Sequence, residues 1–597
     1  MPIRPPVPRA SGRQHLRAWE SVPMRKARRW DVGDVTGRRR RRAGRVAAAA
    51  AVVLLVSVVV GVSTARTDAG LGPHSARYEV TLDHAVTVDL GPLGTIVVDS
   101  PLPLTLGARV VVQEIPREVT ALQGIDTLDA LLNDLESYLQ FFSAPGATVE
   151  VAARGLVWDA ARRAALTFVL ITGSVLALRA VMGRTRREEV ARALVPHRRL
   201  LTGAAVVVVV VAGTVTSGGT EPPGVARDVA PSTVFDGTPL EGARVTGRLA
   251  GVIDTYGGYV VEAYRDNEVF YTQARTNLEQ SWVERVAADA EIAELRASLR
   301  GNLRTPVPSA EVDTEDPATE SPAVQGAGGP TPMWPGVVTD PDELVTAVVV
   351  ADLHCNVGMA PVVGALVELV DADLVLNAGD TTMNGTTVES YCITAFARDI
   401  PDGVPVVVAD GNHDSYETSA QEREVGWTVL EGQVVEVAGV RILGDADPRA
   451  TRVGSGTSLA GQETLAQVDE RMREVACDDG AEVDLLLVHD SAMAISALED
   501  GCAPALVSGH MHRRIGPVRV GDGVRYVNSS TAGALHGRPT VGPLHGVAEM
   551  TVLRFSPEGR IVDYRLVRVY PDTGVTVGFP VRWPGTRPES VLSPGVR

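Results

Sequence analysis

The sequence predicts an α/β domain near the C-terminus, joined to a membrane by three apolar helices and preceded by small α+β segments. Three observations predict this fold class. There are three apolar stretches without charges, a proline-rich stretch follows them, and beyond residue 341 short β-rich apolar runs alternate with helical patterns. Strands separated by crossover helices are typical of α/β domains. The region 341–573 is long enough to bury a sizeable core.

The charge of the chain separates a basic start from an acidic body. Residues 1–45 hold 14 basic and 3 acidic side chains, so the rest of the chain carries −28, against −17 for the whole. This balance argues against a nucleic-acid binder, because an acidic surface repels phosphate backbones. The hydrophobic share of 45% and the charged share of 22% exclude a wholly disordered or fibrous chain.

The three apolar stretches are predicted membrane spans. Val46–Thr64 holds nineteen residues without a charge, enough to cross about 30 Å of hydrocarbon as a helix. Ala164–Leu178 is shorter, and reaches a spanning length over 162–182 if the flanking arginines extend to the interfaces. The third stretch is Leu200–Ser217. The alternative for each is a buried core helix, and for the first also a signal peptide cleaved near Ala65.

Arginines predict the orientation of these spans. Arg38–Arg42 precede the first span and seven arginines lie between 179 and 199, so both regions are expected in the cytoplasm. The protein is therefore expected to be a multi-pass protein of the cell membrane, with its C-terminal α/β domain extracytoplasmic. The predicted division is a basic cytoplasmic tail (1–45), spans (46–64, 162–182 and 200–217), an extracytoplasmic α+β segment (65–161), a cytoplasmic loop (183–199), a membrane-proximal segment (218–304), a Pro-rich linker (305–340), the α/β domain (341–573) and a C-terminal tail (574–597).

Hydrophobic periodicity predicts the elements of the outer segments. Residues 75–116 alternate as strands, and Ile125–Phe142 has helical spacing. After the third span, Val245–Tyr271 is predicted to be strand-rich, and Asn277–Leu303 to be an amphipathic helix dense in Glu and Arg.

Five polar clusters follow the apolar runs of the α/β domain. They are Asp352 and His354 after TAVVV, Asp380 after DLVLN, Asn412, His413 and Asp414 after VPVVV, His489 after VDLLLV, and His510 and His512 after ALVS. Because strand ends in such a sheet converge on one rim, the clusters can meet despite their separation along the chain. Carboxylates and imidazoles suit borderline divalent ions such as Mn, Fe or Zn, and one Asp can bridge two ions. The sequence therefore predicts a site for two divalent metal ions, able to support displacement at phosphorus.

The ordered motifs DLH, GD, GNHD, a lone His after an apolar strand and GHMH resemble those of the calcineurin-like metallophosphoesterase superfamily, here in a membrane-anchored bacterial member. The resemblance covers about 230 residues and implies a β-sandwich flanked by helices. It implies that one metal is held by Asp352, His354, Asp380 and His512, and the other by Asp380, Asn412, His489 and His510. It also implies that His413 contacts the phosphate and protonates the leaving group, with Asp414 orienting its ring.

Two positions depart from the pattern of the superfamily. Members often carry Asp three residues after the GD aspartate, where this chain has Met383. Phosphoprotein phosphatases of the superfamily continue GD into Asp-Arg-Gly, whereas this chain reads GDTTMNG, which disfavours a phosphoprotein substrate. The segment Asn528–Thr531 resembles the turn that closes the site of the family.

The four cysteines all lie in the α/β domain, an even number that suits two disulfides in an oxidising compartment. Three pairings are possible, and we favour Cys355 with Cys392 and Cys477 with Cys502. The competing interpretation is a free thiol at Cys355 beside the metal site.

The expected function is that of a membrane-anchored hydrolase acting on the outer face of the membrane. It would cleave a phosphomonoester or a phosphodiester, by attack of a hydroxide held between two metal ions. The candidate substrates are small molecules, lipid head groups and envelope components, and nucleic acid is disfavoured. Two alternatives stay open: a membrane sensor or scaffold that binds metal or nucleotide without turnover, and an exported nuclease.

Overall fold

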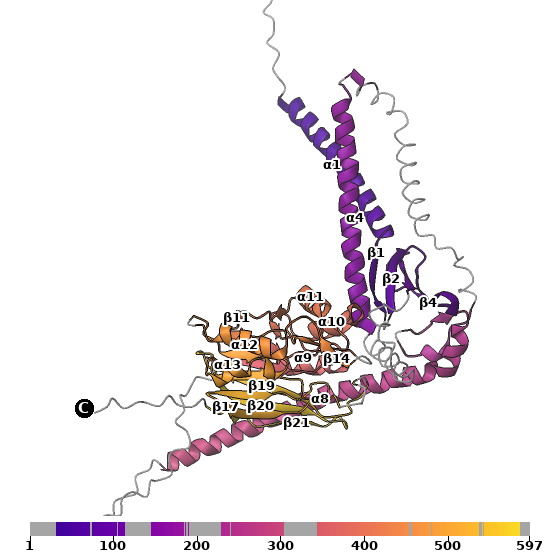
Figure 1. Cartoon of the computed structure of the whole chain (residues 1–597). Helices are drawn as coiled ribbons and strands as arrows, with labels where there is room; N and C mark the ends of the chain where they lie inside the picture. Colours follow the sequence, from indigo (N-terminus) through magenta and orange to yellow (C-terminus); the bar gives the residue numbers. More distant parts are fainter. Residues whose placement is uncertain are drawn as a thin grey trace, which may run out of the picture.

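Figure 1 shows the computed structural model of the chain. The structure describes residues 32–71, 74–103, 105–113, 145–183, 185–186, 189, 229–238, 240–303, 343–452, 456–478, 480–535, 540 and 542–585. Three predicted features lie outside the described residues: the third span at 200–217, the helix at Ile125–Phe142 and the linker at 305–340.

Two long helices, α1 (Val32–Ser63) and α4 (Pro145–Val181), lie side by side and antiparallel (Figure 1). A Cβ on Gly61 of α1 would clash with the main chain of α4 and lie 2.8 Å from Cβ of Ala164, so this glycine lets the two backbones approach closely. The second predicted span is the C-terminal half of α4, whose first half continues the same helix toward the strands that follow α1.

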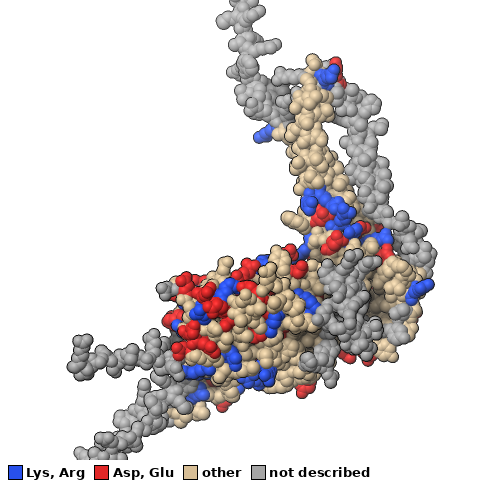
Figure 2. Space-filling model, viewed as in Figure 1, with Lys and Arg blue, Asp and Glu red and all other residues tan. Residues whose placement is uncertain are grey.

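Both helices contain windows long and apolar enough to cross a membrane, Val46–Ser63 and Thr148–Val181. Large apolar side chains of α4, such as Leu166 and Leu170, are more than half exposed. In Figure 2 the upper part of the helix pair forms a belt without charged residues, between charged residues at its two ends. By length and composition, these two helices are candidate membrane spans.

A six-stranded sheet follows α1. In spatial order its strands are β1 (Arg66–Leu71), β2 (His74–Thr81), β5 (Gly107–Val112), β3 (Ala85–Asp89), β4 (Thr95–Asp99) and β6 (Arg244–Val245). The strands predicted within 75–116 are confirmed. The last strand comes from much later in the chain, since Val97 pairs with Arg244 and Ile96 with Val245. Residues 229–247 therefore complete the same unit as residues 66–112.

The helix α8 (Leu249–Leu303) is 55 residues long and includes Leu249–Tyr271, most of the stretch Val245–Tyr271 that we predicted to be strand-rich. Val245 itself lies in the strand β6. For the helical part the prediction was wrong because β-branched and aromatic residues that favour strands are used here to pack a helix. Ile253 and Val261 pack with the six-stranded sheet, and Phe270 and Tyr271 pack against the C-terminal domain. The amphipathic helix predicted at Asn277–Leu303 is confirmed as the second half of α8. Its side chains buried against the C-terminal domain include Phe270, Tyr271, Ala274 and Leu278.

The C-terminal domain is a sandwich of two sheets flanked by helices, as predicted. The first sheet consists of β10 (Thr428–Val429), β9 (Val406–Val408), β8 (Leu374–Asn377), β7 (Val345–Val350), β19 (Ala548–Phe555), β20 (Ile561–Val569) and β21 (Val575–Val577), with β22 (Val581–Arg582) also on β20. The second consists of β11 (Val434–Val437), β12 (Val440–Leu443), β15 (Leu485–Leu487), β16 (Ala505–Ser508), β18 (Gly523–Val527) and β17 (Ile515–Val520).

The central strands are apolar throughout because both faces of each sheet are covered. Ala347 and Val349 of β7 pack between the two sheets, whereas Val348 and Val350 pack toward the outer helices. The helices α9 (Ala360–Leu369) and α10 (Ser390–Asp399) cover the first sheet together with α8, and α12 (Leu465–Ala476) and α13 (Ile495–Glu499) cover the second.

The domain extends beyond its predicted end at residue 573. Both β21 and β22 pair with β20, and the side chain of Trp583 is buried in the core between the sheets. The predicted boundary was too early because these strands are short and no motif marks them.

Both predicted disulfides, Cys355–Cys392 and Cys477–Cys502, are present, and none of the four cysteines is free. The first joins the turn after β7 to α10, and the second joins the end of α12 to the segment after α13. The alternative of a free thiol at Cys355 is wrong.

Candidate metal centre

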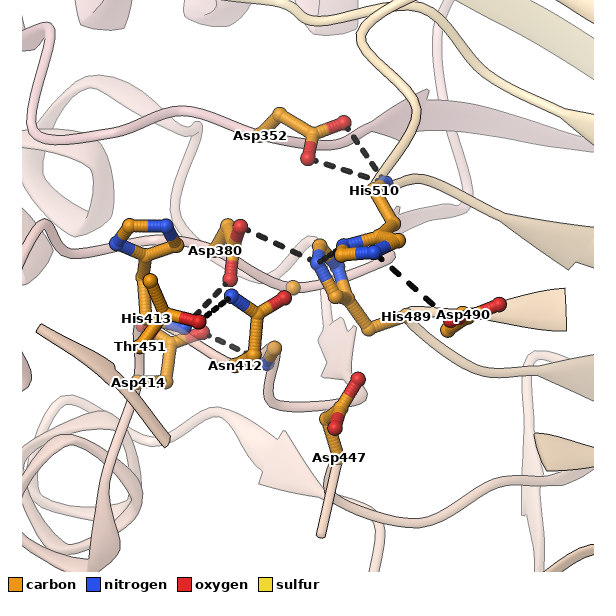
Figure 3. A network of polar contacts seen from close by, with 12 residues as sticks. Asp352, Asp380, Asn412, His413, Asp414, Asp447, Thr451, His489, Asp490 and His510 are labelled. Carbon is orange, nitrogen blue, oxygen red and sulfur yellow. Dashed lines mark hydrogen bonds and ion pairs between the residues drawn. The ribbon is translucent and has the colours of Figure 1, made fainter. Parts of the chain in front are cut away.

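The candidate site lies where parallel strands of both sheets end. The structure brings all nine predicted residues to this rim. Figure 3 labels all of them except His354 and His512. The first sheet contributes Asp352 and His354 after β7, Asp380 after β8, and Asn412, His413 and Asp414 after β9. The second contributes His489 after β15, and His510 and His512 after β16. Because β7, β8 and β9 are parallel, as are β15 and β16, their carboxyl ends share one edge in each sheet.

The residues of the first predicted metal set, Asp352, His354, Asp380 and His512, have one donor atom each within 4.8 Å of all the others. Nε2 of His354 lies 2.9 Å from Nε2 of His512 and 3.7 Å from Oδ2 of Asp380. Nε2 of His512 lies 3.5 Å from Oδ1 of Asp352. The donor atoms therefore converge on one point between the two sheets.

The second predicted set shares Asp380, whose Oδ2 lies 3.2 Å from Nε2 of His489. That nitrogen lies 3.2 Å from Nδ1 of His510. The side-chain amide of Asn412 donates from Nδ2 to Oγ1 of Thr451 at 2.7 Å, which fixes the orientation of the amide. Its Oδ1 is buried and has no hydrogen-bond partner among the residues that the structure describes.

These residues fit divalent metal ions. A buried acceptor without a partner, such as Oδ1 of Asn412, is costly unless a cation or a water meets it. The nitrogen pairs at 2.9 and 3.2 Å match the roughly 3 Å between neighbouring nitrogen ligands that each lie about 2.1 Å from one ion. Carboxylate oxygens and imidazole nitrogens together suit borderline divalent ions.

The backbone is left-handed at five of the predicted ligands, with φ between 43° and 70° at Asp352, His354, Asp380, His510 and His512. They are half of the ten described non-glycine residues with positive φ. Each such residue costs about 1–3 kcal/mol and persists only where the surrounding fold enforces it. Backbone strain is therefore concentrated at this site.

Main-chain amides hold the two carboxylates in place. The amide of His510 donates to both oxygens of Asp352, at 3.0 and 3.1 Å. The amide of His413 donates to Oδ1 of Asp380 at 2.8 Å, which leaves Oδ2 facing the histidines. Such outer contacts orient the ligands of a metal site.

Burial and neighbouring charges shift the pKa values of the site residues in different directions. Burial raises the pKa of Asp352 to about 7 and lowers the pKa of His512 to about 4. Burial also opposes a charge on His489, yet the carboxylates of Asp380 and Asp352 raise its pKa to about 10. A cation at the site would replace the proton on His489 as the partner of both carboxylates.

His413 lies beside the predicted ligands, with its ring perpendicular to that of His354 and the ring centroids 4.9 Å apart. Its Nδ1 lies 2.7 Å from the carbonyl oxygen of Met383. Because a carbonyl only accepts, this contact places a proton on Nδ1 and leaves Nε2 for another partner.

Asp414 does not orient that ring, and this part of the prediction was wrong. Its carboxylate accepts hydrogen bonds from the amides of Thr381, Thr382 and Gly411 and from the hydroxyl of Thr382. These donors belong to the turns after β8 and β9 and occupy both carboxylate oxygens. Asp414 therefore ties the two turns together.

A hairpin of β13 (Arg449–Arg452) and β14 (Gly456–Leu459) contributes residues that the sequence did not reveal. The guanidinium of Arg452 donates to the carbonyls of Asn412 and His413 at 3.3 Å each, and to that of Asp414 at 3.1 Å. These contacts join segments 38 to 40 residues apart, and no local pattern marks them. The hairpin holds the turn that carries His413 and Asn412.

The segment Asn528–Thr531 supports the turn after β7. The hydroxyl of Ser530 donates to the carbonyl of Asp352 at 2.8 Å, and the amide of Thr531 donates to the carbonyl of Ala351 at 2.8 Å. The segment therefore lies beside the site, as its resemblance to the turn that closes the site of the family implied.

Comparisons with known proteins give one family match. Residues 345–514 match the model of the calcineurin-like phosphoesterase family. A search of curated proteins finds no match. Similar solved structures include an archaeal phosphodiesterase (12% identity, TM-score 0.25, 38% of this chain and 100% of that chain), a dimetal phosphatase from Danio rerio (11%, 0.26, 40% and 99%) and a purple acid phosphatase from yellow lupin, Lupinus luteus (13%, 0.27, 40% and 54%).

The matched region begins at β7 and includes every predicted ligand up to His512. Its motifs stand in the expected order, and the fold gathers them at one rim. Residues 345–514 of this chain therefore belong to the calcineurin-like phosphoesterase family.

Proposed function

We propose that the protein is a membrane-anchored phosphoesterase that uses two divalent metal ions to hydrolyse a phosphomonoester or phosphodiester on the outer face of the membrane. The observation that carries the proposal is the pair of ligand sets that meet at Asp380, with His413 beside them. When bound, two divalent ions supply a nucleophile from water and neutralise the charge of the phosphate.

The residues of the chain supply positioning and a proton. Asp380 is the shared ligand, and the amide of His413 holds its Oδ1. His413 presents Nε2 to the departing oxygen, because its Nδ1 is held by the carbonyl of Met383. Arg452 fixes the carbonyls of the turn on which His413 lies.

The proposed membrane topology is supported by the pairing of β6 with β4. This pairing places Arg244 beside Val97, in the sheet that follows α1, whereas α4 carries the chain to the opposite end of the helix pair (Figure 1). If α1 and α4 both cross a bilayer, the chain between residues 183 and 229 must cross it again. The apolar stretch Leu200–Ser217 has the required length.

The orientation rests on the arginines. Arg38–Arg42 in α1 and Arg179 near the end of α4 lie at the ends of these helices away from the sheet (Figure 1), and six further arginines follow Arg179 in the sequence up to residue 199. By the positive-inside rule, the sheet and the phosphoesterase domain would then lie outside. The two disulfides suit an oxidising compartment.

The test uses the full chain in detergent, because α8 is packed into the core of the domain and a fragment beginning in the linker would lack it. Hydrolysis of p-nitrophenyl phosphate and bis-p-nitrophenyl phosphate is measured with added Mn²⁺ and after chelation. His413→Asn is the test variant, and His84→Asn is the matched control on the exposed turn before β3.

We expect turnover that requires metal and falls about tenfold or more in His413→Asn, because the variant loses the contact of the ring with the phosphate. Loss of the proton donor adds little on these esters, whose p-nitrophenolate leaves without a proton. His84→Asn should retain wild-type rates. Metal binding without turnover of either ester would contradict the proposal and favour a non-catalytic sensor. Faster cleavage of DNA than of the small diester would favour a nuclease.

A further inference from the structure

The proton-donating ring of the site is held by a main-chain carbonyl, and not by a carboxylate. Nδ1 of His413 lies 2.7 Å from the carbonyl oxygen of Met383, at the position where members of the superfamily often carry Asp. A carboxylate side chain can adjust to the ring by rotating about its own bonds. A main-chain carbonyl holds the ring in one orientation only if its peptide is itself held, so other residues must fix the turn around Met383.

Glu389 holds this turn. One of its oxygens, Oε1, accepts the amides of Met383 and Asn384 at 3.1 Å each. The other, Oε2, accepts the amide of Thr386 at 2.9 Å and its hydroxyl at 3.0 Å. Three of the four amides from Met383 to Thr386, all but that of Gly385, thus converge on a single carboxylate.

The bonds exceed what helix capping requires. Thr386 and Glu389 form a capping box at the start of the short 3-10 helix Thr387–Glu389, which precedes α10. A capping box needs only the bonds between Thr386 and Glu389. The additional bonds to the amides of Met383 and Asn384 extend three residues further back, to the peptide that bears the carbonyl for His413.

The side chain of Glu389 is also buried, with a relative exposure of 7%. No arginine or lysine pairs with it among the described ion pairs. Burying a carboxylate without a cation is costly unless several donors meet it. Here the donors belong to the turn of Met383, so the position of the carboxylate and that of the turn depend on each other.

We propose that Glu389 is a positioning residue for His413, acting through the carbonyl of Met383. This inference rests on the proposed function, because it assigns a role within the same proton transfer. Glu389 does not touch the reacting atoms. It fixes the direction in which Nε2 of His413 points, and therefore the efficiency with which the leaving oxygen receives its proton.

Two esters with different leaving groups can distinguish a misplaced proton donor from a general loss of structure. A p-nitrophenolate departs without a proton, whereas a phenolate is poorer and gains from protonation as it leaves. The wild-type full chain, Glu389→Gln and His413→Asn are compared on p-nitrophenyl and phenyl esters of the phosphate class that the wild type hydrolyses. In Gln an NH₂ group replaces one of the two acceptors, so one set of amides loses its partner.

We expect Glu389→Gln to lower kcat on the phenyl ester about tenfold more than on the p-nitrophenyl ester, with KM changed less than about twofold, as for loss of general-acid assistance. His413→Asn should show the same selectivity at larger magnitude. The matched control is Asp469→Asn, a carboxylate that accepts the amide and hydroxyl of Ser496 at another helix start, remote from His413. It should lower both rates equally or not at all.

Thr386→Val is a second variant that keeps the carboxylate of Glu389. It removes the hydroxyl bond to Oε2 and the capping bond from the amide of Glu389 to that hydroxyl, but leaves the bonds from the amides of Met383 and Asn384. Its kcat should also fall more on the phenyl ester than on the p-nitrophenyl ester, but by a smaller factor than in Glu389→Gln. Equal losses on both esters in Glu389→Gln and Thr386→Val would overturn the positioning role while leaving the phosphoesterase intact. A wild type inactive on both esters would overturn the proposed function and this inference with it.

Discussion

The docking of α8 on the phosphoesterase domain can be tested by one substitution at its centre. Leu278 is fully buried, and it lies in one apolar cluster with residues of α9, α10 and the first sheet. Leu278→Ala removes the packing of three carbon atoms and leaves a cavity between α8 and the domain. For a fully buried leucine this costs about 3 kcal/mol, within the usual range of about 2–5.

The assay is thermal unfolding of the full chain in one detergent, followed by tryptophan fluorescence. For a domain of this size, about 3 kcal/mol corresponds to a decrease in Tm of roughly 6–12 °C. Leu295→Ala is the control, because Leu295 lies on the same helix and is 59% exposed. Its Tm should lie within about 1–2 °C of wild type, as expected for a surface substitution.

Equal shifts for Leu278→Ala and Leu295→Ala would refute the reasoning, because α8 would then not be part of the core. The expected result has a practical corollary. A fragment that begins in the proline-rich linker loses the whole contact surface of α8, and should unfold at a lower temperature than the full chain.

Three further predictions concern the metal ligands, a disulfide and the topology. Asp380→Asn, which alters the shared ligand, should lower the bound metal from two ions to fewer than one per chain by elemental analysis and abolish hydrolysis; retention of both ions would contradict the shared role. Cys392→Ala opens a 37-residue loop and should lower the free energy of unfolding by about 4 kcal/mol under oxidising conditions. Adding reductant should then lower the free energy of unfolding of the variant less than that of the wild type. Gly44→Cys and Asp99→Cys should react with an impermeant maleimide from opposite sides of the membrane, against a background free of native thiols; labelling from the same side would refute the topology.

The convergence of the candidate metal ligands at one rim was predictable because each stands shortly after an apolar run. The sequence marks a buried parallel strand such as β7 by its continuous β-branched residues, and Asp352 follows at its carboxyl end. The rule that such ends share one rim then brings Asp352 and His510 together without knowledge of the pairing. The sandwich itself followed from the resemblance, and not from periodicity.

The contacts that hold these ligands were not predictable, because they depend on residues that only the fold brings together. Arg452 resembles any surface arginine until the hairpin folds over the turn of His413. Glu389 carries a local capping signal, but nothing in the sequence links it to the carbonyl of Met383. The same holds for α8, whose β-branched residues favour strands until a docking surface for a helix exists.

The two-residue strand β6 links the order of synthesis to the assembly of the outer unit. In the proposed topology, β1 to β5 are translocated before α4 is made, and β4 then presents an unpaired edge. Exposed edges are templates for association with other chains. That edge is closed only when Arg244 and Val245 emerge, after the last crossing of the membrane. If the proposed topology holds, the sheet beside the membrane would be completed only in chains whose last span has inserted, so the pairing of β6 with β4 would follow correct insertion.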